Sequence, residues 1–303
     1  MNIRQLEAFR ATVTAGTVNG AAEMLGTSQS TVSRLIGHLE RSLALTLFDR
    51  ANGRLIPTPE GQLIFEQAEH AYRSYARIQE LAADVRQNRV GQIAISCMPA
   101  LGLSFLPGVI KAFCEKYPGV SISLEIQSSA RVEDWIAAQQ TDFGLAELPF
   151  SRADVAVDEF CRVPYYAIVP PGHPLAARRE LQPLDFDGMP FISMTSVCQV
   201  RHHVDQFFDA HGVRRVTHLE TSYLQAVSEF VHLGMGVALA DPFTVHANLA
   251  RVEARVMRPS LDFGVGLLYP RHRPLSKVCR TFITFLRECR DRCFTEVAAR
   301  CGG

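Results

Sequence analysis

The 303-residue sequence predicts a small helical domain, one long helix and a larger α/β domain. Three observations predict this order. Two short amphipathic segments occupy residues 17–43, a heptad repeat runs through residues 59–90, and strand and helix patterns alternate from Gly91 onward. The domain boundaries expected from these changes of pattern are 1–58, 59–90 and 91–303.

Residues 17–43 have the spacing of two short helices that each bury one face. The apolar positions of the first helix are Val18, Ala21, Ala22 and Leu25. Thr17 is expected to cap its start, because a threonine hydroxyl accepts a free backbone N–H, and Gly26 to end it, because glycine adopts the left-handed conformation at low cost. Thr27 or Ser28 is expected to cap the second helix. The apolar stripe of that helix consists of Val32, Leu35, Ile36, Leu39 and Leu43.

The opposite face of the second helix is polar and basic. It contains Ser30, Arg34, Gly37, His38 and Arg41, with Ser33 at its edge. Glutamine pairs with adenine, arginine with guanine or phosphate, and hydroxyls with either bases or phosphates. The first turn of a recognition helix reaches base edges, which adds Ser28, Gln29 and Thr31 as candidates. The pattern favours a helix-turn-helix that places its second helix in the major groove of double-stranded DNA, and the alternative is a helix pair in a small bundle.

Residues 45–58 favour DNA binding over the bundle. Two short apolar runs flank the Asn-Gly pair at 52–53, which is a strong hairpin signal. Arg50 and Arg54 flank the tip, so we expect a basic wing that contacts the DNA backbone or the minor groove. Residues 1–58 hold six arginines against four acidic residues, a balance of +2. The affinity for DNA is therefore expected to depend on specific side-chain contacts and on dimerisation more than on the net charge of the domain.

The N-terminal segment resembles the winged helix-turn-helix of the LysR-type transcriptional regulators. The matching stretches, in chain order, are MNIRQLEAF, AAEML, SQSTVSRLIGHLE, LFDR and PTPEG. Most members of that family have proline after the glutamine, where this chain has Ser30. Serine keeps a backbone N–H and adds a hydroxyl, so we expect the protein to differ from those members in the base that it prefers at this position. The resemblance implies a sequence-specific transcriptional regulator and not an enzyme, with a DNA operator and RNA polymerase as partners.

The segment 59–90 reads as one helix with an apolar seam. Pro59 suits a first helical turn, and no proline follows before residue 90. The apolar positions alternate in spacing between four and three: Ile64, Ala68, Ala71, Tyr75, Ile78, Ala82 and Val85. A narrow seam with small alanines favours a homodimer, which presents two recognition helices to half-sites about 34 Å apart. The alternative is an amphipathic helix that lies on its own domain.

Composition excludes several classes of protein. Hydrophobic residues make up 47% and charged residues 20% of the chain, with zero net charge, as in ordinary soluble domains. No run suits a membrane span and no signal peptide precedes the first helix, so we expect a cytoplasmic protein without membrane contact whose eight cysteines are free thiols. Cys289 and Cys293 lie one helical turn apart, but no second pair or histidine completes a metal set. We therefore expect no metal and no cofactor.

The segment 91–303 alternates strands and helices. Strands are expected at Gln92–Cys97, 120–126, 142–146, 165–169, 191–193, 216–221 and 236–240, and helices at 104–117, 130–139, 199–210, 224–233 and 275–300. This alternation implies parallel sheets in two α/β lobes. The expected first lobe comprises 91–163 and 268–303, and the second lobe comprises 164–267.

Ligands of parallel sheets bind where the strands end, because helix N-termini point N–H groups there. The candidates in the first lobe are Met98, Pro99, Ala100, Leu101, Ser128 and Ser129. Those in the second lobe are Thr195, Ser196, Thr221, Ser222, Tyr223 and Asp241. Each can also be an ordinary helix cap. The LysR-type resemblance implies a periplasmic-binding-protein-like domain with an effector between its lobes.

Further stretches narrow the resemblance to two branches of the family. The branch of the diaminopimelate decarboxylase activator is similar in the stretches DWIAAQQTDFGLAE, VPPGHPLA, FISM and GVALADP. The opine-responsive regulators are similar in MPAL, SS and DP. Both imply an amino-acid-like effector. A carboxylate would suit Ser128 and Ser129, Arg201 would clamp a second carboxylate, and Glu147 or Asp241 would pair with an ammonium. Surface ion pairing is the alternative for the last three residues.

Other functions fit the sequence less well. Cys198 with His202 or His203 suggests a nucleophile and base, but nothing orients the base. If Cys198 were a redox-sensing thiol, it would need a second cysteine nearby to form a disulfide. The next cysteine in the sequence, Cys279, lies in the other expected lobe. A solute-binding protein would leave the first 90 residues unused, and a regulator that answers an unrelated small organic acid stays an alternative. We expect effector binding to close the lobes and change how dimers associate into a homotetramer.

Overall fold

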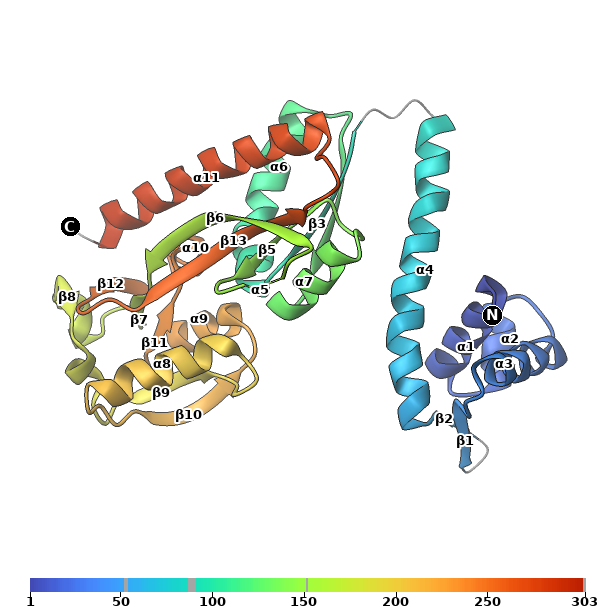
Figure 1. The fold of residues 1–303 in the computed structure, drawn as a ribbon. Coiled ribbons are helices and arrows are strands. Elements are labelled where there is room, and N and C mark those ends of the chain that lie inside the picture. The colour runs from blue at the N-terminus through green and yellow to red at the C-terminus, as the bar shows by residue number, and fades with distance from the viewer. Residues whose placement is uncertain (52–53, 87–90, 151, 302–303) are drawn as a thin grey trace. The chain divides into compact units, whose positions relative to one another are not determined.

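The structure is a computed structural model that contains two units, Met1–Arg89 and Val90–Gly303 (Figure 1). It describes residues 1–51, 54–86, 91–150 and 152–301. Among the described helices, none combines the length and the apolar character that a membrane span requires. Each unit is built around its own core, so the two are described in turn.

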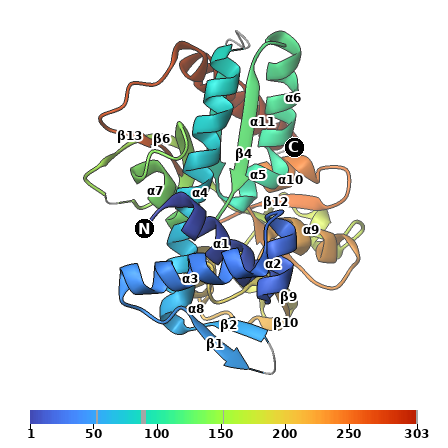
Figure 2. The same cartoon turned by 90° about the vertical axis from the view of Figure 1, so that its right-hand side faces the viewer.

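The first unit groups three short helices, a hairpin and one long helix (Figure 2). In chain order these elements are α1 (Ile3–Ala15), α2 (Val18–Met24), α3 (Gln29–Leu43), β1 (Phe48–Ala51), β2 (Arg54–Pro57) and α4 (Pro59–Arg86). Phe9 of α1 is fully buried, and its ring meets the rings of Phe48 and Phe65 edge-on, at centroid distances of 5.3 and 6.4 Å. Helix α1 therefore joins the hairpin and the long helix to the helix pair.

The predicted helix pair and its caps are confirmed. The Thr17 hydroxyl accepts the backbone N–H of Gly20 at 3.1 Å, and the Ser28 hydroxyl accepts that of Thr31 at 3.2 Å. Gly26 has a φ of +59°, the left-handed conformation that ends a helix. Of the two caps proposed for α3, Ser28 is the one used.

The predicted hairpin pairs β1 and β2 in antiparallel fashion, with Ala51 opposite Arg54. The Asn-Gly tip at 52–53 lies outside the described residues. The backbone N–H of Leu55 donates to the carbonyl of Gly16 at 3.0 Å, which ties the second strand to the turn between α1 and α2. The hairpin is therefore held against the helix pair.

Helix α4 is 28 residues long, as the heptad segment predicts. Ala68 is buried and Ile64 half-buried in the core of the first unit. Farther along the repeat, Ala71 is exposed and the side chain of Ile78 is 65% exposed. The side chains of Ala82 and Val85 lie outside the described ones. Part of the apolar seam is therefore uncovered within this unit.

The second unit contains a five-stranded sheet that forms its first lobe. The strand order is β4 (Ser121–Ile126), β3 (Gln92–Cys97), β5 (Phe143–Glu147), β13 (Asp262–Pro270) and β6 (Val155–Pro164). The helices of this lobe are α5 (Pro99–Ser104), α6 (Leu106–Lys116), α7 (Ser129–Ala137) and α11 (Lys277–Cys301). Strand β3 runs parallel to β4 and β5, whereas β13 runs antiparallel to β5 and β6.

The second lobe holds two smaller sheets. One has the order β11 (Ala238–Ala240), β7 (Tyr166–Val169), β12 (Glu253–Met257) and β8 (Glu180–Leu181), and the other pairs β9 (Pro190–Met194) with β10 (Val216–Thr221). The helices are α8 (Gln199–Ala210), α9 (Leu224–His232) and α10 (Pro242–Ala247), with short 3₁₀ turns at Pro174–Ala177 and Pro183–Phe186.

The sheets contain antiparallel pairs beside the parallel pairs that the alternation of strands and helices predicts. The chain leaves the first lobe along β6 and returns along β13, so these two long strands run in opposite directions and pair antiparallel. Strand β7 is likewise antiparallel to β11 and β12. Only β3 with its two neighbours, β9 with β10, and β12 with β8 show the parallel pairing expected among the described strands.

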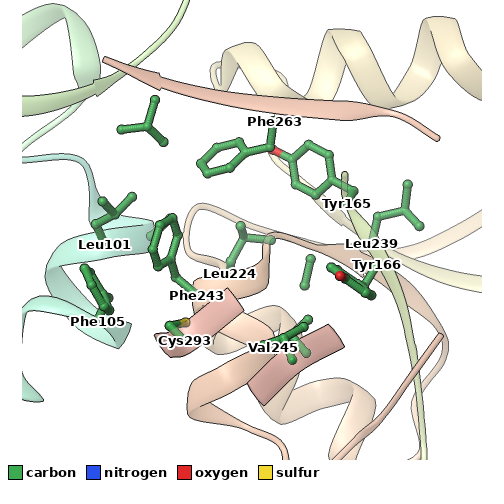
Figure 3. Close-up of a cluster of buried hydrophobic side chains, with 14 of the residues drawn as sticks. Leu101, Phe105, Tyr165, Tyr166, Leu224, Leu239, Phe243, Val245, Phe263 and Cys293 are labelled. Atoms are coloured by element: carbon green, nitrogen blue, oxygen red, sulfur yellow. The ribbon is translucent and has the colours of Figure 1, made fainter. Parts of the chain in front are cut away.

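One hydrophobic cluster connects the lobes (Figure 3). The rings of Phe105 in α5 and Phe243 in α10 lie 4.8 Å apart between centroids. Tyr165, between β6 and β7, packs against Phe263 of β13 at 5.4 Å. Because these contacts join the two lobes at the point where the chain crosses between them, they position the ends of the strands on which the candidate site depends.

Candidate functional site

Helix α3 presents a polar face to solvent. Its apolar stripe buries Val32, Ile36 and Leu39 in the core of the first unit. The predicted DNA-contacting residues Ser28, Gln29, Ser30, Ser33, Arg34 and His38 are exposed, and Thr31 is half-buried. In the part of the chain that the structure describes, no acidic side chain pairs with Arg34. This guanidinium is therefore available for a base or a phosphate.

Three hydroxyls gather in the first turn of α3. The Oγ of Ser28 lies 3.0 Å from the Oγ of Ser30 and 2.8 Å from the Oγ1 of Thr31. Ser30 is the residue at which the sequence analysis expects a departure from the LysR-type pattern. Its hydroxyl is thus coupled to the helix cap, and it gives this position a hydrogen-bonding capacity that proline lacks.

The wing residues lie at the ends of β1 and β2 that adjoin residues 52–53. Arg54 is exposed at the first position of β2. Arg50 lies in β1, and its side chain is outside the described ones. The backbone register therefore places both arginines beside the tip, as the sequence predicts.

A cavity of about 490 Å³ lies between the two lobes of the second unit. The first lobe contributes Met98, Pro99, Ala100, Ile126, Gln127, Ser128, Ser129, Ala130 and Glu147. The second lobe contributes Met194, Val197, Cys198, Val200, Ser222, Tyr223 and Leu224, and the crossing segments contribute Tyr165 and Phe263. Its volume and its mixture of apolar walls with a few polar groups are typical of a small-molecule site.

The structure brings together part of the predicted effector set. Met98, Pro99, Ala100, Ser128, Ser129, Glu147 and Tyr223 line the cavity. Leu101, Thr195, Ser196, Arg201, Thr221 and Asp241 do not line it. Leu101 and Asp241 are fully buried, and Thr195 points its hydroxyl toward Ser222 and Cys198, at 3.4 and 3.6 Å.

The roles predicted for Arg201 and Asp241 are corrected by their partners. The Arg201 guanidinium donates to Asp205 and Glu220, both at 2.6 Å, and to the carbonyl of Met194 at 2.7 Å. It is already neutralised and does not reach the cavity. The Asp241 carboxylate caps α10, where it accepts N–H groups and a hydroxyl. It is therefore a structural cap and not a partner for an ammonium.

Glu147, which lines the cavity, has a raised pKa. It ends β5, and its side chain is 12% exposed. Burial, together with the smaller effect of the Asp241 charge, raises the pKa of Glu147 to about 7. The Glu147 backbone N–H donates to the Ser129 hydroxyl at 3.0 Å, which joins the end of β5 to the start of α7.

Tyr165 is a site residue that the sequence analysis missed. It is 3% exposed, and its hydroxyl has no hydrogen-bond partner among the described residues. Burial raises its pKa, and the charges of Glu147 and Asp241 raise it as well. Tyr165 precedes an apolar strand, so it lacks the polar pattern after a strand that identified the other candidates.

Comparison with known proteins identifies the family. Residues 3–62 match the model of the bacterial regulatory helix-turn-helix protein, lysR family, and residues 86–290 match the LysR substrate binding domain. The chain belongs to the LysR family. As a LysR-family transcriptional regulator it is a DNA-binding protein with an effector-binding domain, and it is not an enzyme.

Three relatives of this LysR-family chain align over most of its length. It is 36% identical over 283 residues to the transcriptional activator protein LysR of Escherichia coli K12, with 93% of this chain and 91% of the relative covered. It is 32% identical to the octopine catabolism/uptake operon regulatory protein OccR of Rhizobium meliloti, with 80% of each chain covered. It is 29% identical to the regulatory protein NocR of Agrobacterium fabrum, with 92% and 93% covered.

The solved structure of CbnR, a LysR-family transcriptional regulator, shows the same fold. Its TM-score is 0.77 at 15% sequence identity, with 95% of this chain and 99% of CbnR covered. Full-length CbnR complexed with its target DNA gives a TM-score of 0.74, again at 15% identity, with 97% and 100% covered. The predicted architecture, a helix-turn-helix domain followed by a two-lobed α/β domain, is therefore confirmed.

Proposed function

We propose that this protein is a cytoplasmic, ligand-responsive regulator that reads an operator with α3 and senses an amino-acid-like compound in the interlobe cavity. The observation that carries the proposal is the presence in one LysR-family chain of an exposed polar recognition face and a cavity of about 490 Å³ that is lined by apolar and polar side chains. RNA polymerase is the partner through which a bound regulator would act on transcription.

The proposed DNA-contacting set has three parts. Ser28, Gln29, Ser30 and Thr31 reach bases from the first turn of α3, while Ser33, Arg34 and His38 follow along its exposed face. Arg50 and Arg54 contact the backbone or the minor groove from the wing. Helix α3 and the wing address adjacent stretches of the same half-site.

Replacing Arg34 with alanine is expected to lower operator affinity by about tenfold or more, because one arginine contact contributes about 1–3 kcal/mol. The slope of affinity against salt concentration should also fall by about one if Arg34 binds a phosphate. Gel-shift titrations at several salt concentrations measure both effects.

Arg4→Ala is the matched control, because it removes the same charge from an exposed position of α1. An Arg34→Ala protein that binds as tightly as the wild type, or a loss that Arg4→Ala reproduces, would contradict the assignment.

We propose a homodimer paired through α4. The repeat leaves Ala71 exposed and Ile78 65% exposed within the first unit, so a second copy of the helix would bury them. Two operator half-sites are then bound together, and pairs of dimers form a homotetramer whose arrangement responds to the effector.

The effector is proposed to place a carboxylate at the start of α7. Ser128 caps this helix, and both Ser128 and Ser129 line the cavity. A helix N-terminus offers free N–H groups and a partial positive charge to an anion. One relative supports the class of ligand: OccR is an octopine catabolism/uptake operon regulatory protein, and octopine is an amino-acid derivative. Met98, Pro99, Ala100 and Tyr223 would form the walls around the rest of the molecule.

Replacing Ser129 with tryptophan is expected to abolish the effector response while sparing DNA binding. The indole would fill the space beside the start of α7 and displace the carboxylate. The readout is the thermal shift produced by a panel of amino acids, alongside gel shifts on the operator. Ser260→Trp is the control, since Ser260 is exposed and lies outside the cavity lining. A ligand-induced shift that persists in Ser129→Trp would refute the proposed pocket.

A redox-sensing role is not favoured. Cys198 lines the cavity, and its sulfur lies 3.6 Å from the Thr195 hydroxyl and 4.0 Å from the carbonyl of Ser222. Among the described contacts of that sulfur there is no second cysteine. The proposed response is therefore ligand binding.

A further inference from the structure

The Glu147 carboxyl lines the cavity without a hydrogen-bond donor of its own. Among the described residues, no side chain or backbone group donates a hydrogen bond to it. The basic side chain recorded beside it there is the His203 imidazole of α8, whose Nδ1 lies 3.8 Å from Oε1, beyond hydrogen-bond distance. A carboxyl group that is 12% exposed and lacks a donor is costly for the fold.

Tyr165 adds a second unsatisfied polar group to the same cavity. Its hydroxyl lacks a hydrogen-bond partner within the described part of the chain, although the side chain is 97% buried and lines the cavity together with Glu147. The charge of Asp241 raises the pKa of both Glu147 and Tyr165. The titratable groups recorded around Glu147 are thus one acid (Asp241), one phenol (Tyr165) and one imidazole (His203).

Glu147 adjoins the start of α7. The Ser129 hydroxyl accepts the backbone N–H of Glu147 at 3.0 Å, so the carboxylate position proposed above and the Glu147 side chain belong to neighbouring residues in space. A ligand that satisfies both carries an anionic and a cationic group a few bonds apart. An α-amino acid has this arrangement, because one carbon joins its carboxylate to its ammonium.

We propose that Glu147 and Tyr165 form the subsite for the α-ammonium group of an α-amino-acid effector whose carboxylate lies at the start of α7. The ammonium donates to the Glu147 carboxylate and to the Tyr165 hydroxyl. This proposal rests on the proposed function and adds to it the chemical group that the cavity requires.

The test compares matched compounds that differ only in the α-amino group. L-norleucine is paired with hexanoate, L-glutamate with glutarate, and L-lysine with 6-aminohexanoate, and each is titrated by calorimetry into the full-length protein. We expect at least one pair in which the amino acid binds about 10- to 100-fold more tightly than its partner. Glu147→Gln should reduce that difference to a few-fold, Tyr165→Phe should reduce it in part, and His203→Gln should preserve it.

A second readout needs no variant. If the amino acid binds the ionised form of Glu147, binding near neutral pH releases a proton, which calorimetry in two buffers of different ionisation enthalpy detects. Compounds without the α-amino group that bind the wild type as tightly as their α-amino partners, or an amino acid that binds without proton release, would overturn the subsite and leave the proposed function standing. A panel in which no compound of either kind binds would overturn the amino-acid-like effector and this subsite together.

Discussion

Replacing Ala71 and Ile78 of α4 together with glutamate is expected to dissociate the protein and to weaken operator binding by about 100-fold or more. Both side chains are exposed within the first unit, so the change leaves its core intact. In a paired helix the same positions face the partner, where four carboxylates in a narrow apolar seam are strongly unfavourable. A monomer then binds one half-site and loses the advantage of the second.

Light scattering measures the dissociation, and gel shifts measure the loss of affinity. Arg73→Glu is the matched control, because it changes the net charge by the same amount from an exposed position of α4 outside the repeat. An unaltered oligomer in the double variant, or an equal loss in Arg73→Glu, would refute the seam.

Replacing Glu147 with glutamine is expected to stabilise the ligand-free protein above neutral pH. Burial holds the pKa of Glu147 near 7 in the folded protein, against an ordinary value of 4.5. The folded state therefore favours the protonated form, and stability declines as the pH rises from about 4.5 through 7, where the carboxyl ionises. Glutamine stays neutral throughout and keeps the shape of the side chain.

The variant should unfold with a free energy about 2–3 kcal/mol higher than the wild type near pH 8 and nearly equal to it near pH 4, since each unit of pKa corresponds to about 1.4 kcal/mol. Denaturant titrations at both pH values measure the difference. Glu115→Gln, at an exposed position of α6, is the control and should change stability by less than about 0.5 kcal/mol. A wild type that is as stable as Glu147→Gln at the higher pH would contradict the burial of an uncompensated carboxyl.

The first unit was largely predictable from local signals. The 3.6-residue spacing determined α2 and α3, Thr17 and Ser28 marked their starts, and the Asn-Gly pair marked the hairpin. These features depend on residues within a few positions of one another. Helix α1, which completes the core through Phe9, was not among the helices argued from spacing, since its role depends on contacts with the hairpin and with α4.

The candidate cavity was predictable only in part. Ser128, Ser129 and Glu147 were found because they follow predicted strands, which is a local pattern. Arg201 and Asp241 follow strands or begin helices as well, but Asp205, Glu220 and the start of α10 already satisfy them. Tyr165 became visible only through its burial between the lobes. Whether such a side chain lines the cavity or is already paired depends on partners that are distant in the sequence. The spacing of residues along the chain does not reveal these partners.

The most direct test of the central claim is to capture genomic DNA fragments with the purified full-length protein, with and without the amino acids that bind it, and to sequence them. The account predicts a small set of inverted-repeat sites whose occupancy or footprint changes when the amino acid is present, and whose enrichment is lost in Arg34→Ala. Fragments without a shared sequence, or sites whose binding is the same with and without every amino acid that the protein binds, would contradict it.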